Sequence, residues 1–348
     1  MKVLIPLTYA ELGGGQRFLL NLIEELSLKG IDFEVWLYES GLMETELKKR
    51  HIKFRLFSKV TSFFGLITFI REIYKCKPDI IYLHATRVIS LIAYFIKIPC
   101  IERINMSRGF EAGGWCRYVW IDRFFTNLNT KNIAVSDSIA KELLDRGVFK
   151  HKIITIKNYV DVDRFSDLSQ RDKIRMDLGV STNQTMVLNI GRMVQQKNQQ
   201  LFIRIAKEIT YKYANVIFVL IGEGPLYSFL QVELSKYELQ DKIRILPFQD
   251  NIQDYYAAAD ILLHTPLWEP LANVLLEAWC SGLSIVATDV EGNREVGPGI
   301  HLFDKDDIQT AIKYILKLKD EPRKLPRTVE KKEQVLNSYL TLFNSVNT

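Results

Sequence analysis

Two carboxylates, Glu269 and Glu277, lie eight residues apart around the start of an expected helix. Pro270 follows Glu269 directly, and proline is favoured in the first turn of a helix. The apolar pattern predicts that this helix covers Ala272–Cys280. Asn273 and Glu277 are four residues apart, so they share a face of the helix. The sequence therefore predicts one carboxylate at the mouth of the helix and a second two turns further along.

The start of this helix also favours an anion. The backbone amides of Leu271, Ala272 and Asn273 point out of the helix, and such amides attract phosphate. A ligand that suits both the amides and the neighbouring carboxylates carries a phosphate and a cluster of hydroxyl groups. A nucleotide sugar is such a ligand. The alternative is a core helix on which the two acids are incidental.

Two cations follow another expected strand. Arg192 and Lys197 are five residues apart, between the expected strand Met186–Ile190 and the expected helix Asn198–Tyr211. Cations placed in this way can hold a diphosphate from two sides. Taken alone, the same two residues also fit a solvated surface pair.

Glycine-rich turns follow two more expected strands. Gly13-Gly14-Gly15 comes after Lys2–Leu7, where glycine lets the backbone approach a phosphate and opens a helix. This is not a dinucleotide fingerprint, because no third glycine follows at the required spacing. Gly222-Glu223-Gly224-Pro225 follows Val216–Ile221 in a similar way. A plain tight turn remains an alternative for both segments.

The segment around the two carboxylates resembles the E-x7-E region of retaining GT-B glycosyltransferases, in particular the large family 4 group. The loop that contains Arg192 and Lys197 resembles that family's G-R-x-x-x-x-K-N motif. The resemblance covers nearly the whole chain. The matching segments are Lys77–Ile81, Asn158–Phe165, Gly191–Asn198, Glu269, Asn273–Ala278, Ser281-Gly282 and Ala287–Asp289.

The resemblance implies a role for each matching residue. Arg192 and Lys197 fall on diphosphate-binding positions, Glu269 faces the donor sugar, and Glu277 binds the ribose. Glu269, Arg192 and Lys197 are therefore the expected catalytic group. Phe248 follows an expected strand, at the point where the family's backbone reads the base, although a plain turn also fits there. The expected donor-binding residues are Gly14, Gly15, Arg192, Lys197, Phe248, Glu269, Leu271, Ala272, Asn273 and Glu277.

The acceptor half departs from the family pattern. Related enzymes often have a histidine just after the strand that follows the Pro-Asp-Ile segment, and here the equivalents are Ile104 or Asn105, which cannot do acid-base work. Asn105 can still donate a hydrogen bond to a sugar hydroxyl or to the departing phosphate. His84 lies at the end of the strand Asp79–Leu83, where ligands gather in parallel sheets, although a packed structural histidine fits equally. The expected acceptor-side residues are His84, Asn105 and Arg108.

Short apolar runs alternate with helical patterns, which predicts an α/β protein with parallel sheets covered on both faces. The resemblance implies a GT-B fold, with two facing Rossmann-like doubly wound domains and a cleft between them. The expected acceptor domain covers residues 1–165 and the donor domain residues 166–348, with a C-terminal helix able to pack back on the first domain. The stretch Asp161–Asn183 is expected to be the linker with one short helix. The remaining expected strands are Phe33–Tyr38, Ile133–Ser136, Ile153–Lys157, Ile243–Leu246, Ile261–His264 and Ser284–Ala287.

Charge divides unevenly along the 348 residues. Residues 1–165 carry 25 Lys and Arg against 18 Asp and Glu, a balance of +7, while residues 166–348 have a balance of −2. The net charge of +5 is too mild for a dedicated nucleic-acid binder. The basic half instead favours an anionic partner such as a membrane surface.

Aromatic and basic residues interleave at Gly109–Arg123 in the first half, and Phe124-Phe125 extends the stretch. They fit core packing, an acceptor groove or a membrane-facing surface. The residues are Phe110, Trp115, Arg117, Tyr118, Trp120, Arg123 and Phe124-Phe125.

Cysteine usage and hydropathy limit the class of protein further. The four cysteines form no CxxC or Cys/His cluster, so zinc and a disulfide scaffold are not expected, and reduced thiols in a cytosol are the simpler interpretation. The N-terminus does not resemble a signal peptide, and the apolar stretch Ile80–Ile101 is interrupted by charges and Pro99. Asp161-x-Asp163 could be taken for a metal-binding D-x-D, but the resemblance places it in the family's interdomain turn, so a metal site is not expected there.

The residues of the expected site fit a nucleotide diphosphate sugar, and the family resemblance implies a retaining glycosyltransferase that moves the sugar to a glycan or lipid-linked acceptor. UDP is the expected nucleotide, with GDP as the alternative. The expected mechanism is same-face attack, with no cofactor and no metal. The expected location is the cytoplasm, with peripheral contact to the inner face of the membrane. The rivals are a Rossmann oxidoreductase, which the missing fingerprint disfavours, and a non-catalytic nucleotide-sugar-binding subunit of a synthase complex.

Overall fold

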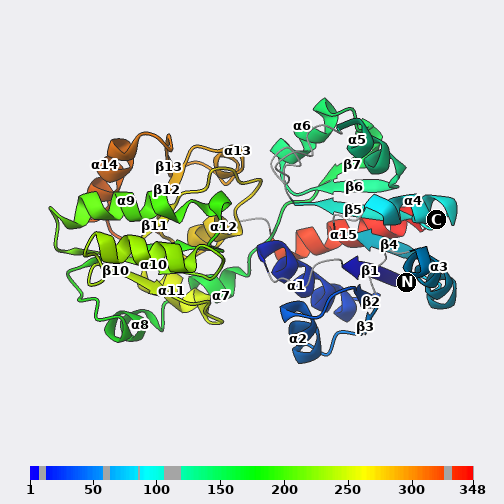
Figure 1. Cartoon of the computed structure of the whole chain (residues 1–348), viewed down its shortest axis with the longest axis horizontal. Coiled ribbons are helices and arrows are strands. Elements are labelled where there is room, and N and C mark those ends of the chain that lie inside the picture. The colour runs from blue at the N-terminus through cyan, green and yellow to red at the C-terminus, as the bar shows by residue number, and fades with distance from the viewer. Residues whose placement is uncertain (8–12, 58–62, 85–86, 106–118, 325–330, 348) are drawn as a thin grey trace. The chain divides into compact units, whose positions relative to one another are not determined.

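The computed structural model describes residues 1–7, 13–57, 63–84, 87–105, 119–324 and 331–347, which form two compact units (Figure 1). Unit 1 comprises Met1–Asn158 and Glu333–Thr348, and unit 2 comprises Tyr159–Lys332. The division therefore comes earlier than the expected boundary after residue 165. The last residues of the chain return to unit 1, in agreement with the expectation that a C-terminal helix can pack back on the first domain.

Unit 1 is built on a parallel sheet whose described strands have the order β3-β2-β1-β4-β5-β6-β7. The strands are β1 (Lys2–Leu7), β2 (Asp32–Leu37), β3 (Phe54–Leu56), β4 (Ile80–Leu83), β5 (Cys100–Ile104), β6 (Lys131–Ala134) and β7 (Ile153–Thr155). The helices are α1 (Gly14–Leu28), α2 (Leu42–Lys49), α3 (Phe63–Cys76), α4 (Arg87–Phe95), α5 (Val119–Leu128), α6 (Asp137–Asp145) and α15 (Lys332–Val346). The order reverses between β1 and β4, and crevices at such reversals are where open α/β sheets bind ligands.

Alternation along β4 assigns the helices of unit 1 to two faces. Ile81 and Leu83 point to one face, where they join a buried apolar cluster with residues of α3 and α4. Tyr82 points to the other face and meets α15, with its ring centroid 6.3 Å from that of Tyr339 and 6.0 Å from that of Phe343. The return of the C-terminal helix to unit 1 therefore rests on a buried aromatic contact.

Unit 2 contains a second parallel sheet, with the order β10-β9-β8-β11-β12-β13. Its strands are β8 (Thr185–Ile190), β9 (Val216–Ile221), β10 (Ile243–Leu246), β11 (Ile261–His264), β12 (Ser284–Thr288) and β13 (Ile300–Phe303). Its helices are α7 (Val162–Ser166), α8 (Arg171–Asp177), α9 (Gln199–Thr210), α10 (Tyr227–Lys236), α11 (Ile252–Ala258), α12 (Asn273–Cys280), α13 (Glu291–Arg294) and α14 (Ile308–Leu318), with a short 3-10 turn at Gln195–Lys197. The order reverses between β8 and β11, so the ends of these two strands mark the crevice of this sheet.

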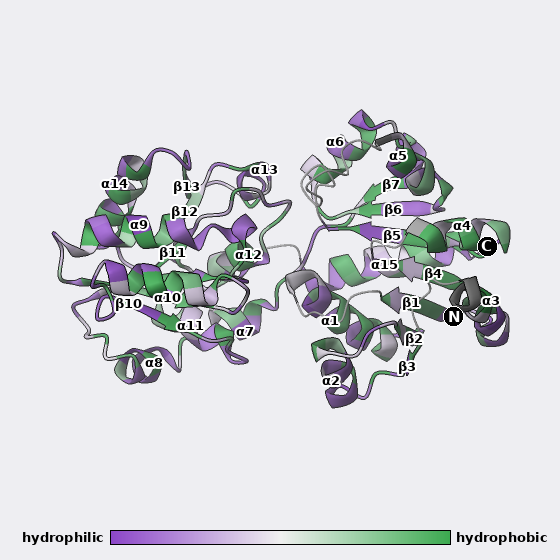
Figure 2. Ribbon diagram, viewed as in Figure 1, coloured by the Kyte–Doolittle hydropathy of each residue, from purple (hydrophilic) through white to green (hydrophobic). Residues whose placement is uncertain are grey.

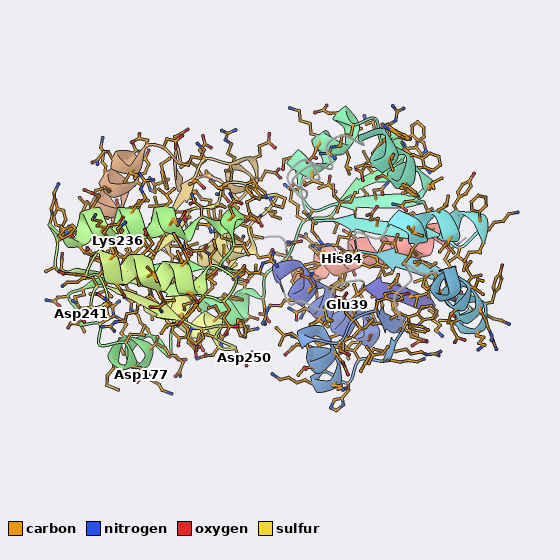
Figure 3. All side chains as sticks on the ribbon, in the orientation of Figure 1. Glu39, His84, Asp177, Lys236, Asp241 and Asp250 are labelled. Atoms are coloured by element: carbon orange, nitrogen blue, oxygen red, sulfur yellow. The ribbon has the colours of Figure 1, made fainter. Side chains whose placement is uncertain are left out.

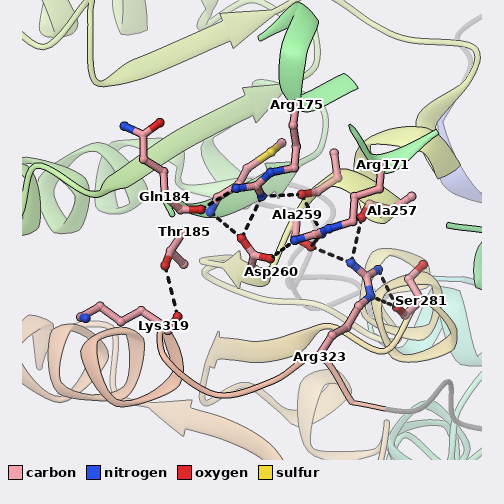
Figure 4. A network of polar contacts seen from close by, with 12 residues as sticks. Arg171, Arg175, Gln184, Thr185, Ala257, Ala259, Asp260, Ser281, Lys319 and Arg323 are labelled. Atoms are coloured by element: carbon pink, nitrogen blue, oxygen red, sulfur yellow. Dashed lines mark hydrogen bonds and ion pairs between the residues drawn. The ribbon is translucent and has the colours of Figure 1, made fainter. Parts of the chain in front are cut away.

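A network around Asp260 joins distant segments of unit 2 (Figure 4). Arg171 and Arg175 of α8 donate to the two carboxylate oxygens of Asp260, at 2.6 and 3.1 Å. Arg323, beyond α14, donates to the backbone oxygens of Tyr256, Ala257, Ala259 and Ser281 at 2.6 to 2.9 Å. The network ties the ends of α11 and α12 together, and these helices carry site residues described below.

The hydropathy pattern agrees with buried sheets and two-sided helices, as the alternating colours along α9 in Figure 2 show. The expected strands are present, with ends that differ by one to two residues. Sequence reasoning missed the strands β3, which has three residues, and β13, and also the helices α2, α4, α5 and α13. The stretch Asp161–Asn183 holds two helices, α7 and α8, and not the single helix expected. No helix within the described ranges is both long and apolar enough to cross a membrane.

Candidate functional site

The central feature of unit 2 is an ion pair between Lys197 and Glu269. The Lys197 ammonium donates to Oε2 of Glu269, and the two side chains are 19% and 9% exposed. Lys197 ends the 3-10 turn after β8, and Glu269 lies between β11 and α12. Two of the three expected catalytic residues are therefore brought together from segments 72 residues apart.

Hydrogen bonds to backbone oxygens hold the two loops that carry this pair. The Leu267 amide donates to the Gln196 oxygen at 2.8 Å, and Gln196 Nε2 donates to the Trp268 oxygen at 3.1 Å. The Thr265 hydroxyl donates to the Asn198 oxygen at 3.1 Å. These bonds fix both loops at the carboxyl ends of neighbouring strands, where a parallel sheet leaves space for ligands.

The surroundings of Glu269 keep it ionised. Burial is the largest influence and alone would raise the pKa of this carboxyl, but the charge of Lys197 and the nearby His264 outweigh it and bring the pKa to about 2. His264 Nε2 lies 3.7 Å from Glu269 Oε2, beyond hydrogen-bond distance, so the contact is electrostatic. Burial, and next the charge of Lys197, lower the pKa of His264. At neutral pH, Glu269 is thus a fixed negative charge that accepts hydrogen bonds and cannot act as a proton donor.

Glu277 on α12 has a buried partner that the sequence did not single out. The Tyr256 hydroxyl, on α11, donates to Oε2 of Glu277 at 2.7 Å, and the Tyr256 side chain is fully buried. Burial, and next the charge of Glu277, raise the pKa of this hydroxyl well above its usual value, so it stays a donor. The bond from Tyr256 therefore holds Oε2 of Glu277 in place. Because the carboxylate is rigid, this bond also restricts the position of Oε1.

The mouth of α12 is arranged as expected. Ala272 precedes the first helical residue, Asn273, and has no side-chain oxygen with which to cap the helix amides. Leu271 and Ala272 are buried, with Glu269 just before them. The backbone amide of Gly292, on α13, donates to the backbone oxygen of Glu269 at 3.0 Å. A Cβ at Gly292 would come within 2.2 Å of the same backbone oxygen. Only glycine permits this approach, which sequence reasoning did not identify.

Arg192 lies on an exposed loop that a second glycine pair supports. A Cβ at Gly222 would lie 2.0 Å from the Gly191 oxygen, and one at Gly224 would lie 2.5 Å from the Met193 oxygen. Both glycines have positive φ, at 155° and 150°. The turn expected beside the nucleotide therefore lies directly against the Arg192 loop. The Phe248 amide donates to Oε1 of Glu223 in the same turn, at 3.2 Å.

Unit 1 brings three of its expected residues together at the crevice of its own sheet. Asn105 Nδ2 lies 3.1 Å from Nδ1 and 3.2 Å from Nε2 of His84, which Figure 3 marks at the end of β4. A Cβ at Gly15 would lie 3.3 Å from Asn105 Nδ2 and 3.7 Å from His84 Cε1. Gly14 begins α1 beside them. Arg108 and residues 109–118 of the aromatic and basic stretch lie outside the described residues.

Metal-binding geometry is not found where the sequence offered a candidate. Asp161, the first residue of the Asp-x-Asp pair, accepts a hydrogen bond from the Arg164 amide at 3.2 Å and caps α7. Across the described ranges, no group of three or more His, Cys, Asp and Glu side chains is placed to hold a metal ion.

Both parts of the chain match models of known families. Residues 12–164 match the family model described as Glycosyltransferase Family 4, and residues 170–335 match the one described as Glycosyl transferases group 1. The chain belongs to the family 4 glycosyltransferases. Its enzyme class is therefore that of a transferase, and its fold is GT-B.

Individual relatives of this family 4 chain extend the comparison. An uncharacterised glycosyltransferase of Methanocaldococcus jannaschii is 30% identical over 47% of this chain and 41% of its own length. The UDP-Gal:α-D-GlcNAc-diphosphoundecaprenol α-1,3-galactosyltransferase of Escherichia coli is 25% identical over 89% of this chain and 86% of its own. The crystal structure of Anabaena HepE in complex with UDP and glucose superimposes with a TM-score of 0.79 at 19% identity, over 100% of this chain and 94% of that one.

Proposed function

We propose that this chain is a retaining glycosyltransferase that uses a nucleotide diphosphate sugar, with UDP as the nucleotide. The observation that carries the proposal is the Lys197–Glu269 pair at the mouth of α12. It sets a cation for a diphosphate beside an ionised carboxylate for sugar hydroxyls, at the crevice of a parallel sheet. The structure of HepE in complex with UDP and glucose supports the choice of nucleotide.

The donor-binding roles follow from the geometry of unit 2. Arg192 and Lys197 neutralise the diphosphate, and the amides at the start of α12 add partial positive charge. Glu277, held by Tyr256, accepts from the ribose hydroxyls. Glu269 accepts hydrogen bonds from hydroxyls of the donor sugar. For this, Lys197 must donate to the diphosphate in place of part of its present bonding to Glu269.

The mechanism we propose is attack on the same face of the sugar from which the nucleotide departs. Glu269 has a pKa near 2 and therefore cannot protonate the leaving group. The departing phosphate takes the proton of the acceptor hydroxyl, while Arg192 and Lys197 stabilise the charge that develops on it. No metal is needed for this step, because these cations and the helix amides supply the positive charge.

A glycan or lipid-linked hydroxyl is the acceptor we propose, and the inner face of the cytoplasmic membrane is the proposed place of action. The E. coli relative is named for a diphosphoundecaprenol-linked acceptor, which supports this class. Large apolar side chains are exposed on α4 and α5 of unit 1. They are Tyr94, Phe95, Trp120 and Phe124. Such residues beside basic ones suit the interfacial region of a membrane.

A two-stage experiment tests the proposal. Thermal shift with UDP-, GDP- and other nucleotide sugars identifies the donor, because a ligand of the native state raises its melting point. Incubation with the labelled donor and lipid-linked acceptors, followed by assignment of the anomeric configuration of the product, tests transfer and retention. Donor binding without transfer or hydrolysis would identify a non-catalytic subunit. An inverted product would exclude the same-face mechanism.

A further inference from the structure

His264 contains a buried nitrogen that makes no hydrogen bond. The residue ends β11, an interior strand of the unit 2 sheet, and its side chain is 2% exposed. Its Nε2 is buried and has no hydrogen-bond partner among the residues that the structure describes. Buried polar atoms are normally paired, because an unpaired one loses its bonds to water without a replacement. The unpaired nitrogen at the crevice of this sheet therefore indicates a bond that forms in another state of the site.

An acceptor lies just beyond hydrogen-bond distance of this nitrogen. His264 Nε2 is 3.7 Å from Oε2 of Glu269, the same oxygen that accepts from the Lys197 ammonium. An N–H···O bond needs about 2.7–3.2 Å between nitrogen and oxygen, so a shift of about 0.5–1 Å would form one. Lys197 and His264 thus face one carboxylate oxygen, and of the two only Lys197 is bonded to it.

The Glu269 carboxylate favours the hydrogen of His264 on Nε2. A neutral imidazole carries one hydrogen, on either ring nitrogen, and a carboxylate can only accept hydrogen bonds. Burial is the largest influence on the pKa of His264 and lowers it, so the ring is neutral at pH 7. The negative charge of Glu269 attracts a hydrogen on Nε2 and repels a lone pair there. The ring can therefore act as a neutral donor toward Glu269.

The backbone that carries His264 is held on both sides. β11 pairs with β8 on one side and with β12 on the other, and the Asn189 side chain of β8 donates to the Leu263 oxygen at 2.6 Å. Glu269 instead lies in the loop between β11 and α12. The movement that closes the 3.7 Å gap should therefore come from the Glu269 side chain, while the imidazole keeps its place.

We propose that His264 is a positioning residue that replaces Lys197 as the hydrogen-bond donor to Glu269 when a diphosphate binds. The Lys197 ammonium then donates to phosphate oxygens, and Nε2 of His264 donates to Oε2 of Glu269. The buried carboxylate keeps a donor within the protein, so it stays ionised and directs Oε1 to the donor sugar. This role rests on the proposed function, because a diphosphate has to attract the lysine. The contact between His264 and Glu269 does not rest on it and is measurable without ligand.

The Lys197→Met variant removes the lysine from Glu269 in the absence of ligand. Nitrogen NMR of the full-length protein with ¹⁵N-labelled histidine follows the ring, and His264→Gln identifies its signals among the five histidines. At pH 8, where Glu269 is ionised, we expect the Nε2–H signal of His264 to move downfield in Lys197→Met because this hydrogen becomes bonded. Lys207→Met should leave the signal unchanged. An unchanged signal in Lys197→Met, or the hydrogen on Nδ1, would overturn the proposal.

UDP supplies the diphosphate to the unaltered chain. We expect saturating UDP to move the His264 Nε2–H signal in the same direction as Lys197→Met does. Binding of UDP that leaves this signal in place would overturn the replacement of Lys197 by His264. If UDP neither raises the melting point nor moves any signal, the proposed nucleotide fails, while the spectrum of Lys197→Met still decides the contact between His264 and Glu269.

Activity distinguishes this role from core packing. His264→Gln keeps an N–H donor near the position of Nε2, whereas His264→Met has no donor. We expect His264→Met to lower kcat about tenfold or more with UDP affinity within about threefold, and His264→Gln to keep both within about threefold. His301→Met is the matched control, because His301 is a half-buried histidine on β13 of the same sheet, with its ring centroid 5.0 Å from that of Tyr314. An equal loss of activity in His264→Gln and His264→Met would show that His264 only fills space.

Discussion

The charge of Lys197 keeps Glu269 ionised. Without the Lys197 ammonium, burial should raise the pKa of the Glu269 carboxyl. Burial favours the neutral carboxyl and is the largest influence on its pKa, which the Lys197 charge reverses. In Lys197→Met the pKa of Glu269 should therefore rise above 4.5 instead of lying near 2. We expect UDP affinity at pH 7 to fall by about tenfold or more, since a charge-assisted bond contributes roughly 1.5–3 kcal/mol.

Calorimetric titration with UDP-sugar from pH 8 to pH 5 measures this change. Affinity should be flat with pH in the unaltered chain, and it should change as Glu269 protonates in Lys197→Met. Lys207→Met is the control, because Lys207 lies on α9 with its ammonium 3.8 Å from the Tyr237 ring centre. A profile for Lys197→Met as flat as that of the control would show that Lys197 does not set the charge of Glu269.

Tyr256 should act on donor binding through Glu277. The Tyr256→Phe variant removes one hydroxyl, and with it the 2.7 Å bond to Glu277. We expect donor KM to rise about tenfold, corresponding to roughly 1.4 kcal/mol, with kcat within threefold. The loss of affinity on replacing UDP by its 2′- or 3′-deoxy analogue should also shrink. Tyr255→Phe is the matched control, because the Tyr255 hydroxyl contacts Gln249 at 3.1 Å. If the deoxy analogues lose as much affinity in Tyr256→Phe as in Tyr255→Phe, Tyr256 does not act on ribose binding through Glu277.

Single-residue prediction from the sequence succeeds where one segment contains the pattern. Glu269 and Glu277 lie in one continuous motif, so their placement at α12 could be predicted. The partner of Glu277 could not, because Tyr256 lies 21 residues earlier on another helix and has no distinctive local pattern. Arg103 and Asn158 are 55 residues apart and meet only because the sheet brings the ends of β5 and β7 together. The functional roles of all these residues stay predictions until the variants are measured.

At the level of elements, close approach between α13 and the Glu269 loop depends on Gly292. A Cβ there would lie 2.2 Å from the Glu269 oxygen and 2.4 Å from the Pro270 carbonyl carbon, so the loop must move. We expect Gly292→Ala to reduce donor affinity more than tenfold. Gly30→Ala is the comparison, because Gly30 has a φ of 88° but nothing within 4 Å of its Cβ position. It should lower stability without changing donor affinity. Unchanged UDP binding by Gly292→Ala would show that the loop tolerates the shift.

Arg323 should stabilise unit 2 by joining α11 to α12. Its guanidinium donates hydrogen bonds to the backbone oxygens of Tyr256, Ala257, Ala259 and Ser281. Burial, and next the charge of Arg171, lower its pKa to about 10, so it stays charged at neutral pH. Arg323→Ala leaves these buried acceptors unpaired, which should lower the free energy of unfolding by about 2–4 kcal/mol. Urea denaturation measures this, with the neighbouring Lys324→Ala as control. Equal midpoints for both variants would exclude a stabilising role.

The sequence predicts elements best where the apolar pattern is long. Strands of five or six buried residues, such as β8 and β9, were predicted within a residue of their ends. β3 has three residues with two of them exposed, so no apolar run marks it. α2 has mostly polar residues and buries only Met43 and Leu47. β3 and α2 are stabilised by contacts with segments far away in the sequence. The hydrophobic pattern within each element does not reveal these contacts.

At the scale of the whole molecule, the charge division agrees with the structural one. The basic half of the sequence corresponds to unit 1, apart from the return of α15, and Arg192 and Lys197, the cations proposed to hold the diphosphate, lie in the acidic half. The proposed donor site therefore does not rely on bulk charge. It uses two cations and the amides at one helix start, whereas the excess charge of unit 1 is available for a larger anionic surface.

Membrane binding by unit 1 should require both this charge and the exposed apolar side chains of α4 and α5. Phe95 is 73% exposed and Trp120 is 68% exposed, and burying such side chains in the interfacial region supplements the attraction of Lys and Arg to anionic lipid. We expect sedimentation with phosphatidylglycerol vesicles at 50 mM salt, weaker binding at 500 mM because the charges are screened, and little binding to phosphatidylcholine.

The Phe95→Ser and Trp120→Ser variants should each reduce the bound fraction while UDP affinity stays unchanged. Met176→Ser, at a side chain 74% exposed on unit 2, is the matched control and should bind vesicles as the unaltered chain does. Binding that is equal for neutral and anionic vesicles, or that depends on Met176 as much as on Phe95, would place the membrane contact elsewhere.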